Sequence, residues 1–296
     1  MAQFPSHVLA TVDPAATDEL ALNTAASIAR DHNAQTSALA ILPPPMYIQR
    51  GTATLEVDFE QDLSSAVVAG LKATCTDLGL AEACANVSRG RVHEAVEDYA
   101  KENDVDLVCV GLHERDLEEY FLGTTATAVL RHVNADVYGC RTGLATGYYR
   151  NVIVALDSGD DALSRSMLAK TKQFLAPYPN ADVHIRHVMR PLAVNWAGSL
   201  EDYASSTGWQ ELNSELIRAT EDGLGALVAD ESLVASSVEV LHGQPSSKIK
   251  EEVQALSADL LIMGTGAHIG IGWHIGSTTN NVMHGVGCDV LAIRPA

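Results

Sequence analysis

Short runs of apolar residues alternate along this chain with longer segments in which apolar positions recur every three or four residues. The short runs contain few polar positions, which is typical of strands buried on both faces. In the longer segments one helix face is apolar, as at Leu22, Ala25, Ala26 and Ala29. For the first half of the chain the pattern predicts strands at 7–12, 35–42, 84–89, 105–111 and 136–141, and helices at 17–32, 57–78, 92–102 and 125–134.

The same pattern occurs twice. The run His7–Asp13 (HVLATVD) recurs as Asn151–Asp157 (NVIVALD), and Val105–Gly111 (VDLVCVG) recurs as Ala258–Gly264 (ADLLIMG). Every residue in the range 90–141 has its counterpart 153 positions later, without a gap. A chain of 296 residues is long enough for two domains with a core each. The sequence therefore predicts a duplication, with one domain at 1–145 and the other at 146–296.

Uniformly apolar strands separated by helices predict an α/β fold in each half, built on a doubly wound, open parallel sheet. In such sheets ligands bind beyond the carboxyl ends of the strands. Asp13 and Asp157 close the first strand of each copy, and Gly111 and Gly264 close the fourth. We therefore expect one crevice per half, with an Asp and a glycine loop on its rim.

The loop Gly264–Ser277 (GTGAHIGIGWHIGS) is the strongest candidate for chemistry. It follows an apolar run and precedes a segment that can form a helix. Glycines let backbone N–H groups approach an anion closely, and a helix start has N–H groups without helical partners. The pattern favours a phosphate-binding loop, and a tight structural turn is the alternative.

The equivalent loop of the first half, Gly111–Thr124, has a different chemistry. His113 stands where the second glycine is expected, and four carboxylates (Glu114, Asp116, Glu118 and Glu119) face a single Arg115. Carboxylates near a polyphosphate oppose its binding. The loop 264–277 contains no acidic residue. A nucleotide is therefore expected in the C-terminal half.

The composition narrows the classes of function. The formal charge is −19, from 38 acidic and 19 basic residues, which disfavours nucleic-acid and anionic-membrane surfaces. We find no apolar run as long as the roughly 18 residues that a membrane helix needs and no export signal, so we expect a cytoplasmic protein. The five cysteines include no CxxC pair and are expected to be reduced core residues.

The sequence gives little support for metal or covalent chemistry. His268, His274 and His284 do not form a closely spaced ligand pair, so no metal site is predicted. We find neither a Walker A sequence nor a nucleophile elbow. No catalytic residue is therefore predicted, and a binding protein is favoured over an enzyme.

Together these features resemble the universal stress protein family, specifically its members with two tandem domains. That family has an Asp closing the first strand, a G-2x-G-9x-G-(S/T) loop after the fourth, and a V-(L/A)-x-(V/I)-(R/K) ending. The second half matches this pattern in order, at Asp157, Gly264, Gly266, Gly276, Ser277 and Ala292–Arg294. One residue separates Gly264 from Gly266 where the family has two, so the loop is one residue shorter than the family pattern.

The resemblance implies an adenine nucleotide alpha hydrolase-like, Rossmann-like fold with a nucleotide pocket. By this resemblance Asp157 would contact adenine or ribose, and backbone groups near Val188 would line the base. The ribose and phosphates would be held by Gly264, Gly266, Gly276, Ser277 and Thr278. The implied cofactor is ATP or AMP, with or without Mg²⁺.

The resulting hypothesis is a cytoplasmic stress-response sensor that binds an adenine nucleotide in its C-terminal domain. The first domain would serve as a built-in pairing partner, an internal pseudo-dimer joined through 136–141 and 289–294, and a further homodimer is left open. Two alternatives remain. One is a weak ATPase or self-phosphorylating protein, and the other is a scaffold or small-ligand carrier that binds no nucleotide.

Overall fold

A computed structural model of the chain describes residues 3–14, 19–42, 56–112, 124–141, 149–157, 161–190, 207–266, 276–283 and 285–294. The first half contains β1 (His7–Val12), α1 (Leu20–His32), β2 (Gln35–Leu42), α2 (Glu56–Asp77), the short 3-10 helix η2 (Glu82–Cys84), β3 (Ala85–Arg89), α3 (Val92–Glu102), β4 (Leu107–Gly111), α4 (Thr124–His132) and β5 (Asp136–Cys140). The second half contains β6 (Asn151–Ala155), α5 (Asp161–Leu175), β7 (Asp182–Met189), α7 (Thr207–Asp230), β8 (Ser237–His242), α8 (Pro245–Ala255), β9 (Leu260–Gly264), α9 (Ser277–Met283) and β10 (Asp289–Ile293).

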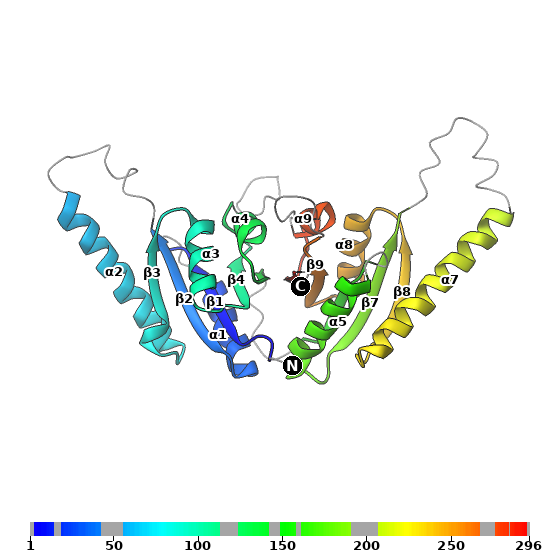
Figure 1. Ribbon diagram of the computed structural model, residues 1–296, viewed down its shortest axis with the longest axis horizontal. Helices are drawn as coiled ribbons and strands as arrows, with labels where there is room; N and C mark the ends of the chain where they lie inside the picture. The colour runs from blue at the N-terminus through cyan, green and yellow to red at the C-terminus, as the bar shows by residue number, and fades with distance from the viewer. Residues whose placement is uncertain are drawn as a thin grey trace, which may run out of the picture.

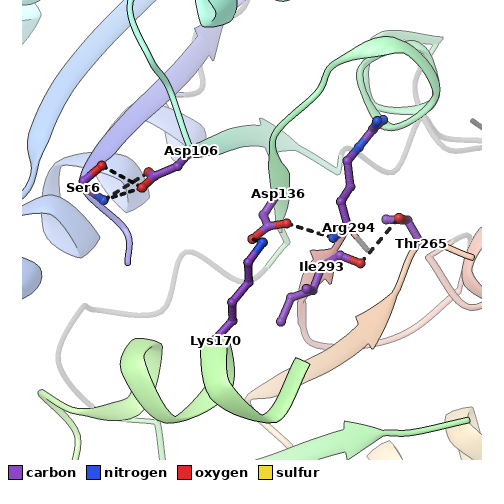
Figure 2. A network of polar contacts seen from close by, with 7 residues as sticks. All are labelled: Ser6, Asp106, Asp136, Lys170, Thr265, Ile293 and Arg294. Atoms are coloured by element: carbon purple, nitrogen blue, oxygen red, sulfur yellow. Dashed lines mark hydrogen bonds and ion pairs between the residues drawn. The ribbon is translucent and has the colours of Figure 1, made fainter. Parts of the chain in front are cut away.

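The elements of the first half agree closely with those predicted from the apolar pattern. The largest differences are that α1 begins at Leu20 rather than 17, β4 begins at Leu107 rather than 105, and α4 ends at His132 rather than 134. Directly before β4, the carboxylate of Asp106 accepts a hydrogen bond from the backbone N–H group of Ser6 at 2.8 Å (Figure 2) and one from that of His7 at 3.0 Å. This residue therefore fastens the start of β1.

The ten strands of the described residues join in one sheet with the order β3-β2-β1-β4-β5-β10-β9-β6-β7-β8. Within each half the strands are parallel, and β5 and β10 pair antiparallel, with Leu291 opposite Tyr138. The prediction that the last strands of the two halves form the seam is confirmed. The predicted boundary between residues 145 and 146 lies outside the described residues and stays a prediction.

Helices cover both faces of this sheet, and the two halves stand side by side along it (Figure 1). On one face the buried side chains of α1, α2, α5 and α7 form a single apolar cluster with the strands. On the other face α3, α4, α8 and α9 form a second cluster. Each cluster contains residues of both halves, so the core continues across the seam. The predicted α/β fold class is confirmed.

The five cysteines are all free thiols and are all buried. Burial raises the pKa of the Cys75 and Cys288 thiols to about 12. A thiol with so high a pKa carries little of the reactive thiolate at neutral pH. The expectation that these cysteines are reduced core residues agrees with this placement.

Polar contacts across the seam follow the duplication. Asp136 accepts a hydrogen bond from the backbone N of Arg294 at 2.8 Å, and its counterpart Asp289 accepts one from the backbone N of Arg141 at 2.7 Å. Both carboxylates are about 2% exposed. The other oxygen of Asp136 pairs with Lys170 Nζ at 2.6 Å (Figure 2), whereas that of Asp289 accepts from the Tyr138 hydroxyl at 2.9 Å. The two equivalent aspartates thus have different partners, a lysine for Asp136 and a tyrosine hydroxyl for Asp289.

Aromatic side chains pack where α1 of the first half meets α5 of the second. His32 lies against Phe174, with ring centroids 5.3 Å apart, and Phe174 also contacts Tyr149 and Tyr178. The Tyr178 hydroxyl donates to Asp31 at 2.7 Å. This cluster attaches the two halves to each other on the face of the sheet opposite α4 and α9.

Candidate functional site

The carboxyl edge of β6 brings Asp157 to the rim of the second half. The backbone leading to it is held on both sides: Leu156 N donates to Arg186 O at 2.9 Å, and Leu156 O contacts His187 Nδ1 at 2.9 Å. The Ser164 hydroxyl in α5 donates to Asp157 O at 2.9 Å. The main chain is therefore fixed by β7 and α5, while the side chain of Asp157 is exposed.

Val188 lies close to this edge. The ladder between β6 and β7 ends at the pair Ala155 and Arg186, so Val188 extends beyond the last residue of β6 that pairs with β7. On its other side it pairs with Leu241 of β8. Its side chain is partly buried against the apolar cluster of α8 and α9. The structure thus places Val188 at the same sheet edge as Asp157, two residues past the end of the ladder.

The two ends of the glycine loop are tied together by hydrogen bonds. Gly276 N donates to Thr265 O at 2.8 Å, and the buried Thr279 hydroxyl donates to Gly264 O at 2.7 Å. Thr265 N in turn donates to Ile293 O of β10 at 2.9 Å. The start of α9 is therefore held directly against the end of β9. Ser277 is exposed and Thr278 is partly exposed at this junction.

The three glycines of the described loop ends differ in what requires glycine at each position. A Cβ on Gly264 would lie 3.2 Å from Met167 Sδ, which is a tight contact with α5. Gly266 has φ +100°, which strongly favours glycine. Gly276 is different, because a Cβ there would lie 3.7 Å or more from its neighbours in the described structure. Neither packing nor a positive φ explains the glycine at 276.

The loop residues 267–275, with His268 and His274, lie outside the described residues, as does His284. Within the described part of the chain no group of three or more His, Cys, Asp or Glu side chains is placed to hold a metal ion. The same part contains no helix long and apolar enough to cross a membrane.

Comparison with known proteins identifies the relationship. The sequence model of the universal stress protein family matches residues 6–141 and again residues 148–294. The chain belongs to the universal stress protein family. Universal stress protein A homolog 2 of Coxiella burnetii is 27% identical over 146 residues, which cover 49% of this chain and 95% of that protein.

Solved structures agree on the fold. A functionally unknown protein from Pseudomonas aeruginosa PAO1 aligns with TM-score 0.70 and 17% identity, over 98% of this chain and 92% of that one. A universal stress protein from Archaeoglobus fulgidus DSM 4304 aligns with TM-score 0.66 and 16% identity, over 98% of this chain and 96% of that one. At this identity the likeness shows the fold alone. Both alignments span the tandem arrangement of this universal stress protein.

The first half of this universal stress protein repeats the frame of the site with different side chains. Leu112 N donates to Cys140 O at 2.8 Å, which repeats the bond from Thr265 N to Ile293 O. The side chain of Leu112, however, is apolar and 4% exposed. The position equivalent to Thr279 is Ala126, which has no hydroxyl to tie the helix to the strand. The acidic residues 114–119 lie outside the described residues.

Leu112 occupies space that is closed in the second half. A Cβ on Gly139 would lie 2.7 Å from Leu112 Cδ1, so the leucine fills the room that this glycine leaves. The counterpart of Gly139 is Ala292, whose own Cβ takes that space. The first half has therefore an apolar plug where the second has a polar loop end.

Thr265 and Thr279 were not among the residues predicted from the sequence, although both hold the loop together. A signal for them was present in the duplication. At the offset of 153, their counterparts in the first half are Leu112 and Ala126. At these two described positions of the loop ends, the second half has a hydroxyl where the first has an apolar side chain. The glycine pattern concerns residues without side chains, so it did not indicate the hydroxyls of these neighbouring threonines.

Proposed function

We propose that this protein is a stress-response sensor, located in the cytoplasm, that binds an adenine nucleotide in its second half. Gly276 carries the proposal. It lies where the loop ends are clamped together, yet among the described residues neither packing nor a positive φ requires glycine there. A residue kept without a side chain at the mouth of a clamped loop leaves space for something outside the chain. Phosphate is the ligand that such a glycine loop accepts through backbone N–H groups.

The polar groups around the proposed phosphate position support this assignment. Ser277 and Thr278 present hydroxyls at the start of α9, and Gly266 turns the chain away from β9. Because the protein carries a net charge of −19, an anion has to be held by local donors rather than by the field of the whole molecule. Backbone N–H groups and neutral hydroxyls meet that need.

Asp157 and Val188 supply the other end of the proposed site. Asp157 is an exposed carboxylate on a fixed backbone, which suits the hydroxyls of a ribose or a Mg²⁺ ion held by the phosphates. Val188 lies beyond the ladder with β6, at the edge where the adenine ring would lie. The proposed ligand, ATP or AMP, would thus run from β7 past β6 to the loop after β9.

The first half is proposed to bind no nucleotide. Leu112 and Ala126 replace the two threonines that shape the loop ends, and the loop sequence adds four carboxylates. An incoming phosphate would meet an apolar plug and like charge rather than hydroxyls.

A pair of matched variants tests the proposal. Gly276→Ala adds one methyl group that the described structure accommodates, so its thermal unfolding midpoint should stay close to that of the wild type. Its affinity for ATP·Mg, measured by isothermal titration, should fall by on the order of tenfold or more, about 1.4 kcal/mol per factor of ten.

The control is Gly123→Ala, the counterpart of Gly276 in the first half. It should leave the affinity unchanged. Equal losses in both variants, or none in either, would contradict the placement of the site. Release of inorganic phosphate during the titration would instead favour the ATPase alternative.

A further inference from the structure

The helix α9 is attached to both halves of the protein. Its first turn belongs to the proposed site, because Gly276 N bonds to Thr265 O and Thr279 bonds to Gly264 O. Its last turn belongs to the seam, because Arg141 of the first half donates from Nη2 to Met283 O at 3.0 Å. The helix has seven residues, so these two ends are only about 10 Å apart at 1.5 Å per residue.

Side-chain packing attaches the same end of α9 to the first half. Met283 is fully buried, and its Cε would lie 3.2 Å from a Cβ on Gly139 of β5. The same Cβ would touch Leu112, so Met283, Leu112 and the backbone of β5 share one packed contact. A two-turn helix has little stability of its own, and its position is set by what holds its ends. One of those holders is the opposite half.

The duplication repeats this contact in the opposite direction, from the second half to the first. Arg294, the counterpart of Arg141, donates from Nη2 to Leu130 O at 2.8 Å, and Leu130 is the counterpart of Met283. In Figure 2 the side chain of Arg294 points toward α4. The helix held by Arg294 follows the first-half loop, which is not proposed to bind nucleotide. The two arginines therefore make the same contact to two helices with different neighbours.

We propose that Arg141 is a positioning residue through which the first half sets the nucleotide affinity of the second. This inference rests on the proposed function. The guanidinium holds the carbonyl end of α9, where a cation also complements the helix dipole. When that hold is lost, α9 shifts relative to β9, and Ser277 and Thr278 leave the positions in which they meet the phosphates. By reciprocity, a bound nucleotide strengthens the contact between the halves.

The test compares Arg141→Met with Arg294→Met, using isothermal titration of ATP·Mg. Arg141→Met should weaken binding about tenfold, within the range typical of coupled sites, and Arg294→Met should leave it unchanged. Arg294 is the more buried of the two, at 4% exposure. If the loss of nucleotide affinity came only from general destabilisation of the protein, it would therefore be at least as large in Arg294→Met as in Arg141→Met. Equal affinities in the two variants would overturn the proposal.

Arg141→Lys supplies a conservative variant. A lysine keeps the positive charge and one donor for the Met283 carbonyl, so affinity should lie between those of the wild type and Arg141→Met. If Arg141→Lys binds no better than Arg141→Met although it is equally well folded, the hydrogen bond to α9 is not the cause, and the proposal fails.

Amide hydrogen exchange without ligand separates this inference from the proposed function. In Arg141→Met the amides of Asn280–Met283 should exchange roughly tenfold faster than in the wild type, and in Arg294→Met they should not. This result decides whether Arg141 positions α9 even if the wild-type protein binds no nucleotide. A wild type without nucleotide binding would refute the proposed function. Unchanged exchange in Arg141→Met would refute the positioning role.

Discussion

The two halves of this universal stress protein share one order of strands and helices, although their side chains differ at many equivalent positions. The retained residues hold the frame: Asp106 and Asp259 fasten the entrances of β1 and β6, and Arg141 and Arg294 each reach the carbonyl end of a helix in the opposite half. Among the many residues that differ, two pairs lie at the carboxyl edge, where the first half has Leu112 and Ala126 and the second has Thr265 and Thr279. The comparison separates contacts that both copies share from side chains that only the proposed site would use.

The seam offers the largest contrast between the halves, because Asp136 has Lys170 as partner and Asp289 has Tyr138. Lys170→Met should reduce the free energy of unfolding by about 3–5 kcal/mol, since it leaves a buried carboxylate without its cation. Tyr138→Phe removes one neutral donor from Asp289 and should cost about 1–3 kcal/mol. Burial holds the pKa of the Tyr138 hydroxyl well above its usual value, so it remains a donor.

Urea unfolding measures both changes. Lys172→Met is the control, because Lys172 donates to the backbone carbonyl of Glu231 at 3.2 Å in an exposed position, and this bond should contribute little. A Lys170→Met variant as stable as Lys172→Met would show that the ion pair does not distinguish the two sides of the seam.

The apolar plug of the first half predicts a double-mutant effect. Gly139→Ala should destabilise the protein by about 1–3 kcal/mol, because its Cβ meets Leu112 Cδ1 at 2.7 Å. In the Leu112→Ala/Gly139→Ala double variant that clash is gone. Its loss of stability in urea unfolding should therefore be smaller than the sum of the two single losses. Strict additivity would mean that Leu112 does not fill the space beside Gly139.

The hydroxyl that closes the second-half loop predicts a smaller change. Thr279→Val keeps the shape of the side chain and removes its bond to Gly264 O, so stability should fall by about 1 kcal/mol and nucleotide affinity should fall with it. Thr220→Val is the matched control, because that hydroxyl donates to Leu216 O on exposed helix α7. Thermal unfolding with and without ATP·Mg measures both effects. Equal nucleotide-induced shifts in the two variants would remove Thr279 from the site.

The smallest effect is expected at His32, where α1 of one half meets α5 of the other. Burial lowers the pKa of His32 below 6.5, and this outweighs the opposing influence of Asp31, the backbone of Phe174 and Asp106. The unfolded chain therefore binds the proton more readily than the folded one. The stability that neutral His32 contributes is fully present above pH 6.5 and is lost as the pH falls toward the lowered folded pKa.

His32→Gln should reduce the change in the free energy of unfolding between pH 7.5 and pH 5.5 by about 1 kcal/mol or less. The carboxylates titrate in both proteins, so the relevant quantity is the difference between wild type and variant, obtained from urea unfolding at each pH. Parallel pH profiles would show that His32 does not contribute to the acid sensitivity of the contact between the halves.

Much of this organisation could be predicted from the sequence, because apolar periodicity and a gap-free repeat are strong signals of buried parallel strands. The strand bounds of β1 and β2 were predicted in this way. The seam between the last strands of the two halves was expected from the resemblance to the family, and its antiparallel direction was not predicted, since it depends on main-chain pairing between residues 151 positions or more apart. The threonine clamp and the reach of Arg141 were also missed. Both depend on side-chain contacts that no local pattern reports.

If Gly276 leaves room for an adenine nucleotide in the second half, the protein should retain that nucleotide through purification. Freshly purified protein, denatured and analysed by mass spectrometry of the released small molecules, tests this directly against Gly276→Ala prepared in parallel. Adenine nucleotide should approach one per chain in the wild type, and little should be found in the variant. No adenine nucleotide in either protein, together with no thermal shift of the wild type in millimolar ATP·Mg, would contradict this expectation.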